Sequence, residues 1–185
     1  MAKSKHTIRI ISGTHRGRLL PVLDIAGLRP TGDRVRELLF NWLQFDVAGK
    51  KVLDLFSGTG ALGFEAASRG ADSVTMLDTS RQVINQLRKA SLDFGFNNIQ
   101  ISQQSALDFV KVSIDKFDLV FLDPPFADNI LNQVSESIEN SVKPSGFVYR
   151  ECGKDQELMK MPNNWELYRQ KIIGQVKIEL WRKLN

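Results

Sequence analysis

The stretch Asp54-Leu-Phe-Ser-Gly-Thr-Gly-Ala-Leu-Gly63 has the residue types of a nucleotide-type cofactor site. It begins within the run Lys51-Val-Leu-Asp-Leu-Phe56, whose apolar and β-branched residues are typical of a strand buried in a parallel sheet. Gly58 and Gly60 have no Cβ, so the backbone can adopt positive φ there and a ligand can lie against the peptide groups. A helix is predicted from 61 to 68, and its N-terminal N–H groups would point toward that ligand.

A second stretch, Asp123-Pro-Pro-Phe126, follows the apolar run Phe117-Asp-Leu-Val-Phe-Leu122 and is predicted to lie at the end of a later strand. In an open α/β sheet, ligands bind at the carboxyl ends of the strands. Asp54 lies inside the first strand, where a buried carboxylate is costly unless it is hydrogen-bonded. We therefore expect Asp54 to order the glycine loop or to meet a cationic ligand.

A third carboxylate, Asp78, ends the predicted strand Ser73-Val-Thr-Met-Leu-Asp78, 20 residues beyond Gly58. This separation suits a carboxylate that accepts hydrogen bonds from both ribose hydroxyls of an adenosine cofactor. The alternative is that Asp78 caps the next helix, predicted at 81–94, although Thr79 or Ser80 could cap it equally well.

Together, Asp-Leu-Phe-Ser-Gly-Thr-Gly and Asp-Pro-Pro-Phe resemble the motifs of S-adenosylmethionine-dependent amino-methyltransferases of class I fold. With Arg29-Pro-Thr-Gly-Asp-Arg-Val-Arg-Glu37 and Leu-Phe-Asn41 upstream, the chain resembles the bacterial 16S ribosomal RNA guanine-N2 methyltransferases from Arg9 to Leu184. The resemblance implies a Rossmann-like α/β fold, with a mostly parallel seven-stranded sheet, an antiparallel last strand and helices on both faces. It implies S-adenosylmethionine as cofactor, S-adenosylhomocysteine as product, and 16S ribosomal RNA in a small subunit or assembly intermediate as partner.

The resemblance also assigns residues to the cofactor site. It implies cofactor contacts by Asp54, Phe56, Ser57, Gly58, Thr59, Gly60, Asp78, Ser105 and Ala106. Ser105 and Ala106 follow the predicted strand 98–102, at the position where relatives contact the adenine ring. Many relatives carry an acidic residue first in this motif, whereas this chain has Ser105 there and Asp108 one turn later.

The expected catalytic residues are Asp123, Pro124, Pro125 and Phe126. The exocyclic amine of a nucleobase is a poor nucleophile because its lone pair is delocalised into the ring. Asp123 and the carbonyl of Pro124 can each accept a hydrogen bond from the amine, which favours a tetrahedral nitrogen. The two prolines fix φ, so the acceptors are held before substrate arrives. Phe126 offers a face on which the flipped base can stack. An alternative for Asp-Pro-Pro is a simple turn after a strand.

The N-terminal part of the chain is basic. Residues 1–41 contain eight Lys or Arg against three Asp or Glu, whereas the whole chain has a net charge of +4. Such a segment suits a polyanionic partner, although a solubilising arm has the same composition. We expect RNA contacts by Arg9, Arg16, Arg18, Arg29, Arg34 and Arg36. The chain is predicted to divide into a basic extension, 1–30, and a methyltransferase domain, 31–185.

The remaining elements are predicted from apolar periodicity. Residues 7–12 and 18–22 would form a hairpin, which with two strands must lean on the main domain or be ordered by its ligand. A helix is expected at 33–45, with Val35, Leu38, Leu39 and Trp42 on its apolar face and Arg34 and Arg36 elsewhere. A further helix at 129–142, a strand at 146–149 and an edge hairpin at 165–172 and 176–181 complete the plan.

Composition limits the class of protein. A chain of 185 residues can bury a core as one domain, and a single cysteine, Cys152, allows neither an internal disulfide nor a Cys-based metal cluster. No apolar stretch follows the basic N-terminus, so neither a signal peptide nor a membrane contact is expected. We therefore expect a cytoplasmic monomer that needs no metal.

Other functions fit parts of the pattern. A DNA adenine-N6 methyltransferase uses a similar Pro-Pro-aromatic motif but typically carries a larger target-recognition region, and protein glutamine methylation uses similar chemistry. A nicotinamide-dependent oxidoreductase would satisfy Gly58-x-Gly60-x-x-Gly63 but leaves Asp54 and Asp123 unexplained. A non-catalytic RNA-binding protein could keep the fold without turnover.

Overall fold

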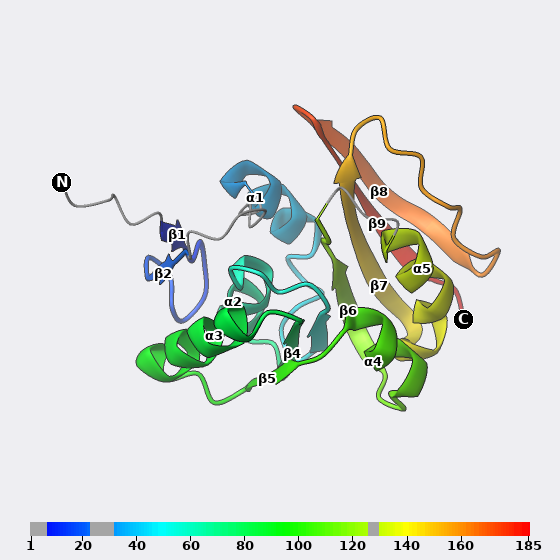
Figure 1. Ribbon diagram of the computed structural model, residues 1–185. Coiled ribbons are helices and arrows are strands. Elements are labelled where there is room, and N and C mark those ends of the chain that lie inside the picture. The colour runs from blue at the N-terminus through cyan, green and yellow to red at the C-terminus, as the bar shows by residue number, and fades with distance from the viewer. Residues whose placement is uncertain (1–6, 23–31, 126–129) are drawn as a thin grey trace.

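The computed structural model describes residues 7–22, 32–125 and 130–185. Its centre is a seven-stranded sheet in the order β5-β4-β3-β6-β7-β9-β8, shown in Figure 1. Strands β3 to β7 are parallel where they pair, and β9 is antiparallel to both of its neighbours. The strands are β3 (Lys51–Asp54), β4 (Ser73–Asp78), β5 (Ile99–Gln103), β6 (Phe117–Leu122), β7 (Val142–Gly153), β8 (Trp165–Ile173) and β9 (Val176–Lys183).

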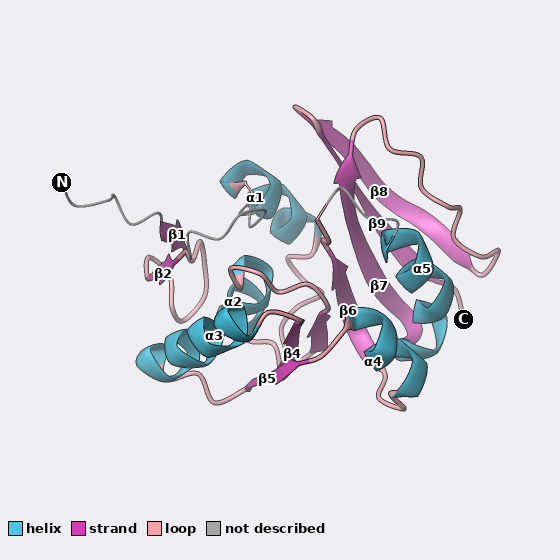
Figure 2. Cartoon of the chain, viewed as in Figure 1, coloured by secondary structure: helices cyan, strands magenta, loops and turns pink. Residues whose placement is uncertain are grey.

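Helices cover both faces of this sheet, as Figure 2 shows. On one face lie α1 (Asp33–Trp42), α2 (Ala61–Ser68) and α3 (Arg81–Phe94), and on the other lie α4 (Ala106–Val112) and α5 (Ile130–Ser137). A 3₁₀ turn, η1 (Ile138–Ser141), leads from α5 into β7. The strands alternate between the two cores: Val52 faces α1 and α2, whereas Leu53 faces α4 and α5. The Rossmann-like fold and the antiparallel last strand predicted from the sequence are confirmed.

Two helices differ from their predicted bounds or faces. The predicted helix 129–142 is divided into α5 and η1. The helix predicted at 33–45 ends at Trp42, and its buried residues are Val35, Arg36, Leu39 and Phe40. Arg36 thus lies on the inner face, which the sequence pattern had assigned to apolar residues alone.

The N-terminal hairpin is formed by β1 (Thr7–Arg9) and β2 (Leu19–Pro21), shorter strands than predicted. It leans on the main domain, as expected of a two-stranded unit. The buried carboxylate of Glu65 in α2 accepts hydrogen bonds from the backbone N–H groups of Ile11 (2.7 Å) and Ser12 (3.0 Å). The His15 ring also stacks on Phe96, with ring centroids 3.9 Å apart. The hairpin is therefore fixed to α2 and to the end of α3.

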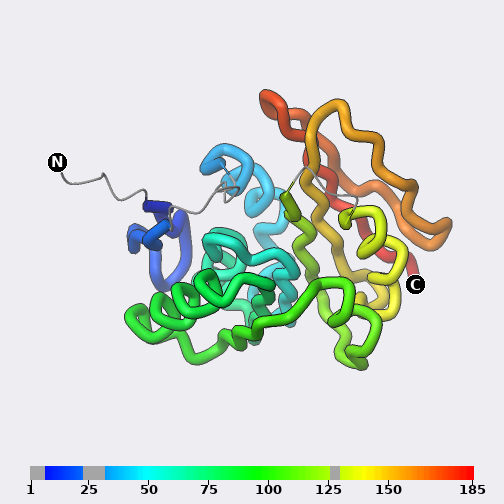
Figure 3. The backbone as a smooth tube through the Cα atoms, viewed as in Figure 1, coloured from blue at the N-terminus to red at the C-terminus, as the bar shows by residue number. Residues whose placement is uncertain are grey.

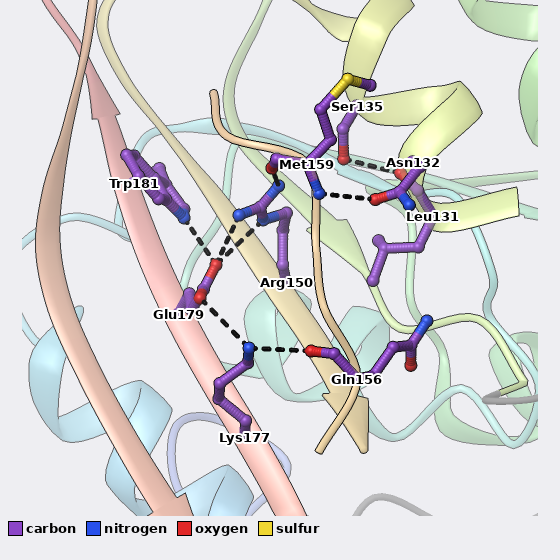
Figure 4. A network of polar contacts seen from close by, with 9 residues as sticks. All are labelled: Leu131, Asn132, Ser135, Arg150, Gln156, Met159, Lys177, Glu179 and Trp181. Carbon is purple, nitrogen blue, oxygen red and sulfur yellow. Dashed lines mark hydrogen bonds and ion pairs between the residues drawn. The ribbon is translucent and has the colours of Figure 1, made fainter. Parts of the chain in front are cut away.

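A buried polar network stabilises the opposite face, beside α5 (Figure 4). Arg150 in β7 donates through Nε to Glu179 of β9 (3.2 Å) and forms an ion pair with it through Nη2 (2.5 Å). Arg150 also donates to the carbonyl of Met159, whose backbone N–H donates to Asn132 of α5. The segment between β7 and β8 is thereby tied to the helix that follows Asp123-Pro-Pro-Phe126.

Within residues 7–22, 32–125 and 130–185, none of the helices has both the length and the apolar character of a membrane span.

Candidate functional site

A glycine turn connects β3 to α2 at the carboxyl end of the sheet. Within this turn, the backbone N–H of Gly60 donates a hydrogen bond to the carbonyl of Ser57 at 2.6 Å. The backbone angle φ is +48° at Gly58 and +81° at Gly60. The buried Ser57 is anchored twice, by its N–H to the carbonyl of Leu77 and by its hydroxyl to the carbonyl of Asp54. The positive φ values predicted from the sequence are confirmed. Phe56 and Thr59 are half-buried in the same turn.

The third glycine of the pattern has a packing role. A Cβ at Gly63 would lie 2.8 Å from the side chain of Met76 in β4, so this glycine allows α2 to approach the sheet closely. Its backbone N–H donates to Oδ2 of Asp54 at 3.1 Å. This contact joins the end of β3 to the first turn of α2 across the glycine loop.

Asp54 is buried, and its pKa is raised from 3.8 to about 7. Burial is the main cause, followed by the negative charge of Asp123, with a smaller contribution from Asp78; hydrogen bonds from the backbone of Gly63 and Phe56 lower it. Asp123 and Asp78, which lie at the ends of the two strands beside β3, are therefore close enough to repel the charge of Asp54.

Asp78 ends β4 and links the two sides of the turn. Its Oδ2 accepts a hydrogen bond from the backbone N–H of Gly58 at 3.1 Å, and its Oδ1 accepts one from the N–H of Ser80 at 2.8 Å. Ser80, rather than Asp78, is the N-cap of α3, because its hydroxyl accepts from the N–H of Val83. The structure thus brings the carboxylate proposed to hold the ribose directly against the glycine turn.

Asp123 and Pro124 follow β6, the neighbour of β3 in the sheet. Asp123 is half-buried, Pro124 is buried and Pro125 is exposed. Phe126, the fourth predicted catalytic residue, lies outside the described residues, as does Arg29 of the predicted RNA-binding set.

Glu151 and Tyr149 of β7 were not predicted as site residues. Leu122 pairs with Arg150, so Glu151 lies beside Asp123 in the next position of the two parallel strands. The Tyr149 hydroxyl donates to Oε2 of Glu151 at 2.6 Å. Burial first, and the charge of Asp123 second, raise the pKa of Glu151 to about 8, while the hydrogen bond from Tyr149 lowers it. The sequence feature that could have indicated Glu151 as a site residue is its position two residues after Tyr149, at the end of an apolar run.

Ser105 and Ala106 begin α4 just after β5. The Ser105 hydroxyl accepts a hydrogen bond from the N–H of Asp108 at 3.4 Å, so Ser105 is the N-cap of this helix. Ala106 is buried and Asp108 is exposed. The N–H of Gln104 donates to the carbonyl of Asp78, which places the start of this segment beside the end of β4.

The predicted RNA-binding arginines divide into two groups. Arg9, Arg16, Arg18 and Arg34 are exposed. Arg36 is fully buried, and its Nη2 donates to the carbonyl of Arg9 at 3.0 Å and pairs with Asp33. This position joins α1 to β1 and gives Arg36 a structural contact in place of the open surface that the RNA prediction assumed.

The site thus aligns four acidic side chains at the carboxyl end of the sheet: Asp78 in β4, Asp54 in β3, Asp123 just after β6 and Glu151 in β7. The glycine turn offers backbone groups to a nucleotide-like ligand, and a cationic ligand would relieve the repulsion among the carboxylates. Asp123 can accept a hydrogen bond from a neutral amine. In the described part of the chain, no group of three or more His, Cys, Asp or Glu side chains is placed to hold a metal ion.

Comparisons with known proteins give consistent matches. Residues 8–182 match the family model described as Conserved hypothetical protein 95. The chain is 45% identical to ribosomal RNA small subunit methyltransferase D of Haemophilus influenzae, covering 97% of this chain and 95% of that protein. It is 39% identical to the protein of the same name from Escherichia coli K12, covering 99% and 96%. The solved structure of yhhF from Escherichia coli aligns with a TM-score of 0.90 at 36% identity, covering 97% and 99%.

Proposed function

Since the chain belongs to the family of ribosomal RNA small subunit methyltransferase D, we propose that it transfers a methyl group from S-adenosylmethionine to the N2 amine of a guanine in 16S ribosomal RNA. The observation that carries this proposal is the arrangement of β4, β3 and β6. It brings Asp78 and the glycine turn, the predicted donor site, next to Asp123, the predicted amine site.

The residues present fit the methyl donor. Asp78 would hold the ribose hydroxyls, the turn of Phe56, Ser57, Gly58, Thr59 and Gly60 would line the rest of the donor, and Ser105 and Ala106 would lie against the adenine. The raised pKa of Asp54, which the charge of Asp123 helps to cause, is the property of a site that favours a cation. When bound, S-adenosylmethionine supplies an electrophilic methyl group on a positively charged sulfur.

Asp123 and the carbonyl of Pro124 would prepare the amine. Each accepts a hydrogen bond from it, which draws the nitrogen lone pair out of conjugation with the ring. Pro124 and Pro125 restrict the backbone, so these acceptors need little reorganisation. Phe126 would stack on the guanine after it leaves its own stack. The proton released from the amine would pass to Asp123 or to water.

The RNA itself would be bound by the basic N-terminal part of the chain. Arg9, Arg16, Arg18 and Arg34 are exposed around the hairpin and the start of α1, and Arg29 lies between them in sequence. We assign residues 1–30 to an RNA-contacting extension and 31–185 to the methyltransferase domain. The substrate would be a small subunit or an assembly intermediate, and the enzyme a cytoplasmic monomer.

Transfer of labelled methyl from S-adenosylmethionine to three substrates tests this function. Purified small subunits, deproteinised 16S RNA and duplex DNA are compared, and the product nucleosides are separated. N2-methylguanosine from either ribosomal sample is the expected result. N6-methyladenine from the DNA would keep the chemistry and overturn the substrate, and labelling of none of them would overturn the proposal.

A further inference from the structure

The hairpin of β8 and β9 carries three cations and a tyrosine on the face of the sheet that holds the site. Arg169 pairs with Leu180 and Lys171 pairs with Ile178. Both partners belong to the core beneath α1 and α2, and paired residues of antiparallel strands lie on the same face. Arg169 and Lys171 are exposed, so this face is open to solvent beyond α1.

Strand register connects these cations to the site. Lys171 lies in the same row as Ile178 and Glu151, and Glu151 lies beside Asp123. Arg169 lies in the neighbouring row, with Leu180 and Tyr149. From β6 to β8 there are three strand spacings, or about 14 Å. The cationic edge is therefore within reach of nucleotides that flank a base held at Asp123.

Tyr168 and Arg169 form an ordered stack on this face. The Arg169 guanidinium carbon lies 4.3 Å from the Tyr168 ring centroid, and its Nη1 donates to the Tyr168 carbonyl at 2.9 Å. The Tyr168 ring packs on Phe147 at 5.3 Å, which supports it from below. A β-bulge between Leu167 and Arg169 allows both side chains to use the same face.

The third cation, Arg182, lies 6.0 Å from the Phe147 ring centroid. Glu166, which pairs with it across the strands, has a carboxylate 3.8 Å away that partly offsets its positive charge. Cations on an edge strand also discourage pairing with a second sheet, which would explain Lys171 alone. Protection of the edge strand does not explain why the Arg169 guanidinium lies on the Tyr168 ring, on the face of the sheet that leads to Asp123. Aromatic rings beside arginines are the common platform for unpaired nucleotides.

We propose that Tyr168, Arg169 and Lys171 form a second RNA-binding surface, which holds the strand flanking the target guanine; this rests on the proposed function. The N-terminal hairpin and the β8–β9 hairpin lie on opposite sides of α1 in Figure 3. The RNA would thus be bound on both sides of the site. Arg169 and Lys171 contact phosphates, and an unpaired base stacks on the outer face of the Arg169 guanidinium, whose inner face lies on the Tyr168 ring.

Two pairs of substitutions with the same charge change test the surface. The test pair is Arg169→Gln with Lys171→Gln. The control pair is Lys111→Gln with Lys116→Gln, which removes two exposed cations near the amino end of β6. Filter binding with deproteinised 16S RNA measures affinity at several salt concentrations, and calorimetry measures binding of S-adenosylmethionine.

The test pair should weaken RNA binding roughly tenfold. It should also reduce the slope of log binding constant against log salt concentration by about two, because each lost cation leaves one phosphate without its partner. The control pair should change the RNA affinity and the salt slope much less than the test pair does. Tyr168→Leu, which keeps an apolar contact with Phe147, should weaken binding without changing the salt slope. Donor binding should stay at the wild-type value in all three variants.

Equal losses of affinity in the test and control pairs would show a non-specific charge effect and overturn the proposal. So would RNA affinity that is unchanged in the test pair. If the KM for intact subunits rose while affinity for free RNA did not, the surface would bind ribosomal protein and the RNA assignment would be wrong. Absence of methyl transfer by the wild-type protein would overturn the proposed function, whatever the binding measurements show.

Discussion

Oδ2 of Asp54, at the end of β3, accepts a hydrogen bond from the backbone N–H of Gly63 in the first turn of α2, at 3.1 Å. The contact spans the glycine turn and fixes the helix start against the strand. Because the carboxyl is buried beside other acidic groups, this contact is also sensitive to pH. The stability of the protein should therefore report the charge of the proposed donor site.

Asp54→Asn should make the unfolding free energy less sensitive to pH between the ordinary pKa of the carboxyl, 3.8, and its raised pKa of about 7. In the folded protein Asp54 keeps its proton up to a pKa of about 7, against 3.8 as the ordinary value. Its contribution to stability is thus complete below pH 3.8, falls as the pH rises from 3.8 to about 7, and is constant above that. Relative to wild type, the variant should gain about 2–4 kcal/mol in unfolding free energy between pH 5 and pH 9. Denaturant titrations at each pH measure this.

The exposed Asp72 provides the control, since Asp72→Asn should leave the pH dependence as it is in wild type. If the unfolding free energies of Asp54→Asn and wild type differed by the same amount at every pH between 5 and 9, the raised pKa of Asp54 would be contradicted.

Gly60→Ala should destabilise the glycine turn by two separable effects. The residue has φ +81°, and a Cβ would lie 2.6 Å from the Phe64 ring and 2.7 Å from Leu87. Gly174→Ala is the matched control, because Gly174 has φ +59° and nothing within 4 Å of an added Cβ. We expect a loss of about 1 kcal/mol at Gly174 from backbone strain and 2–4 kcal/mol at Gly60 from strain plus overpacking. Thermal unfolding measures both, and equal losses would argue against the packing contribution.

Glu65→Gln should release the N-terminal hairpin. The Glu65 carboxylate also accepts from Nε of Arg69 at 2.7 Å, besides the two backbone groups of Ile11 and Ser12. An amide offers one acceptor oxygen in place of two, so at least one buried donor loses its partner. The unfolding free energy should fall by roughly 2–3 kcal/mol, and amide hydrogen exchange at 8–12 should accelerate. Glu37→Gln, at an exposed position of α1, should change neither.

Some elements followed directly from sequence pattern. Helix α3 has the predicted bounds of Arg81–Phe94, because a strong apolar periodicity begins after a capping serine and ends before Gly95. The positive φ at Gly58 and Gly60 and the edge hairpin around Gly174 were also predicted, and the relatives at 45% and 39% identity confirm the predicted family. In each case the signal is local to the segment.

Contacts between distant segments could not be read in the same way. Arg36 was placed on the outside of α1 because it is charged, yet it is buried against β1, where a backbone carbonyl and Asp33 accept its hydrogen bonds. Glu151 was missed because the strand was predicted to end at Tyr149, whereas β7 continues to Gly153. Its proximity to Asp123 depends on the register of β6 with β7, which no local pattern encodes.

The division of roles between Asp78 and Asp123 is the central claim of this account. The measurement compares Asp78→Asn and Asp123→Asn for affinity of S-adenosylmethionine by calorimetry and for single-turnover methyl transfer at saturating donor and RNA. Asp123→Asn should bind the donor within about threefold of wild type and lose roughly 10²-fold or more in transfer rate, because it loses a charged acceptor for the amine. Asp78→Asn should lose at least tenfold in donor affinity and recover most of the transfer rate at saturation. Equal losses of donor affinity in both variants, or wild-type transfer by Asp123→Asn, would contradict the account.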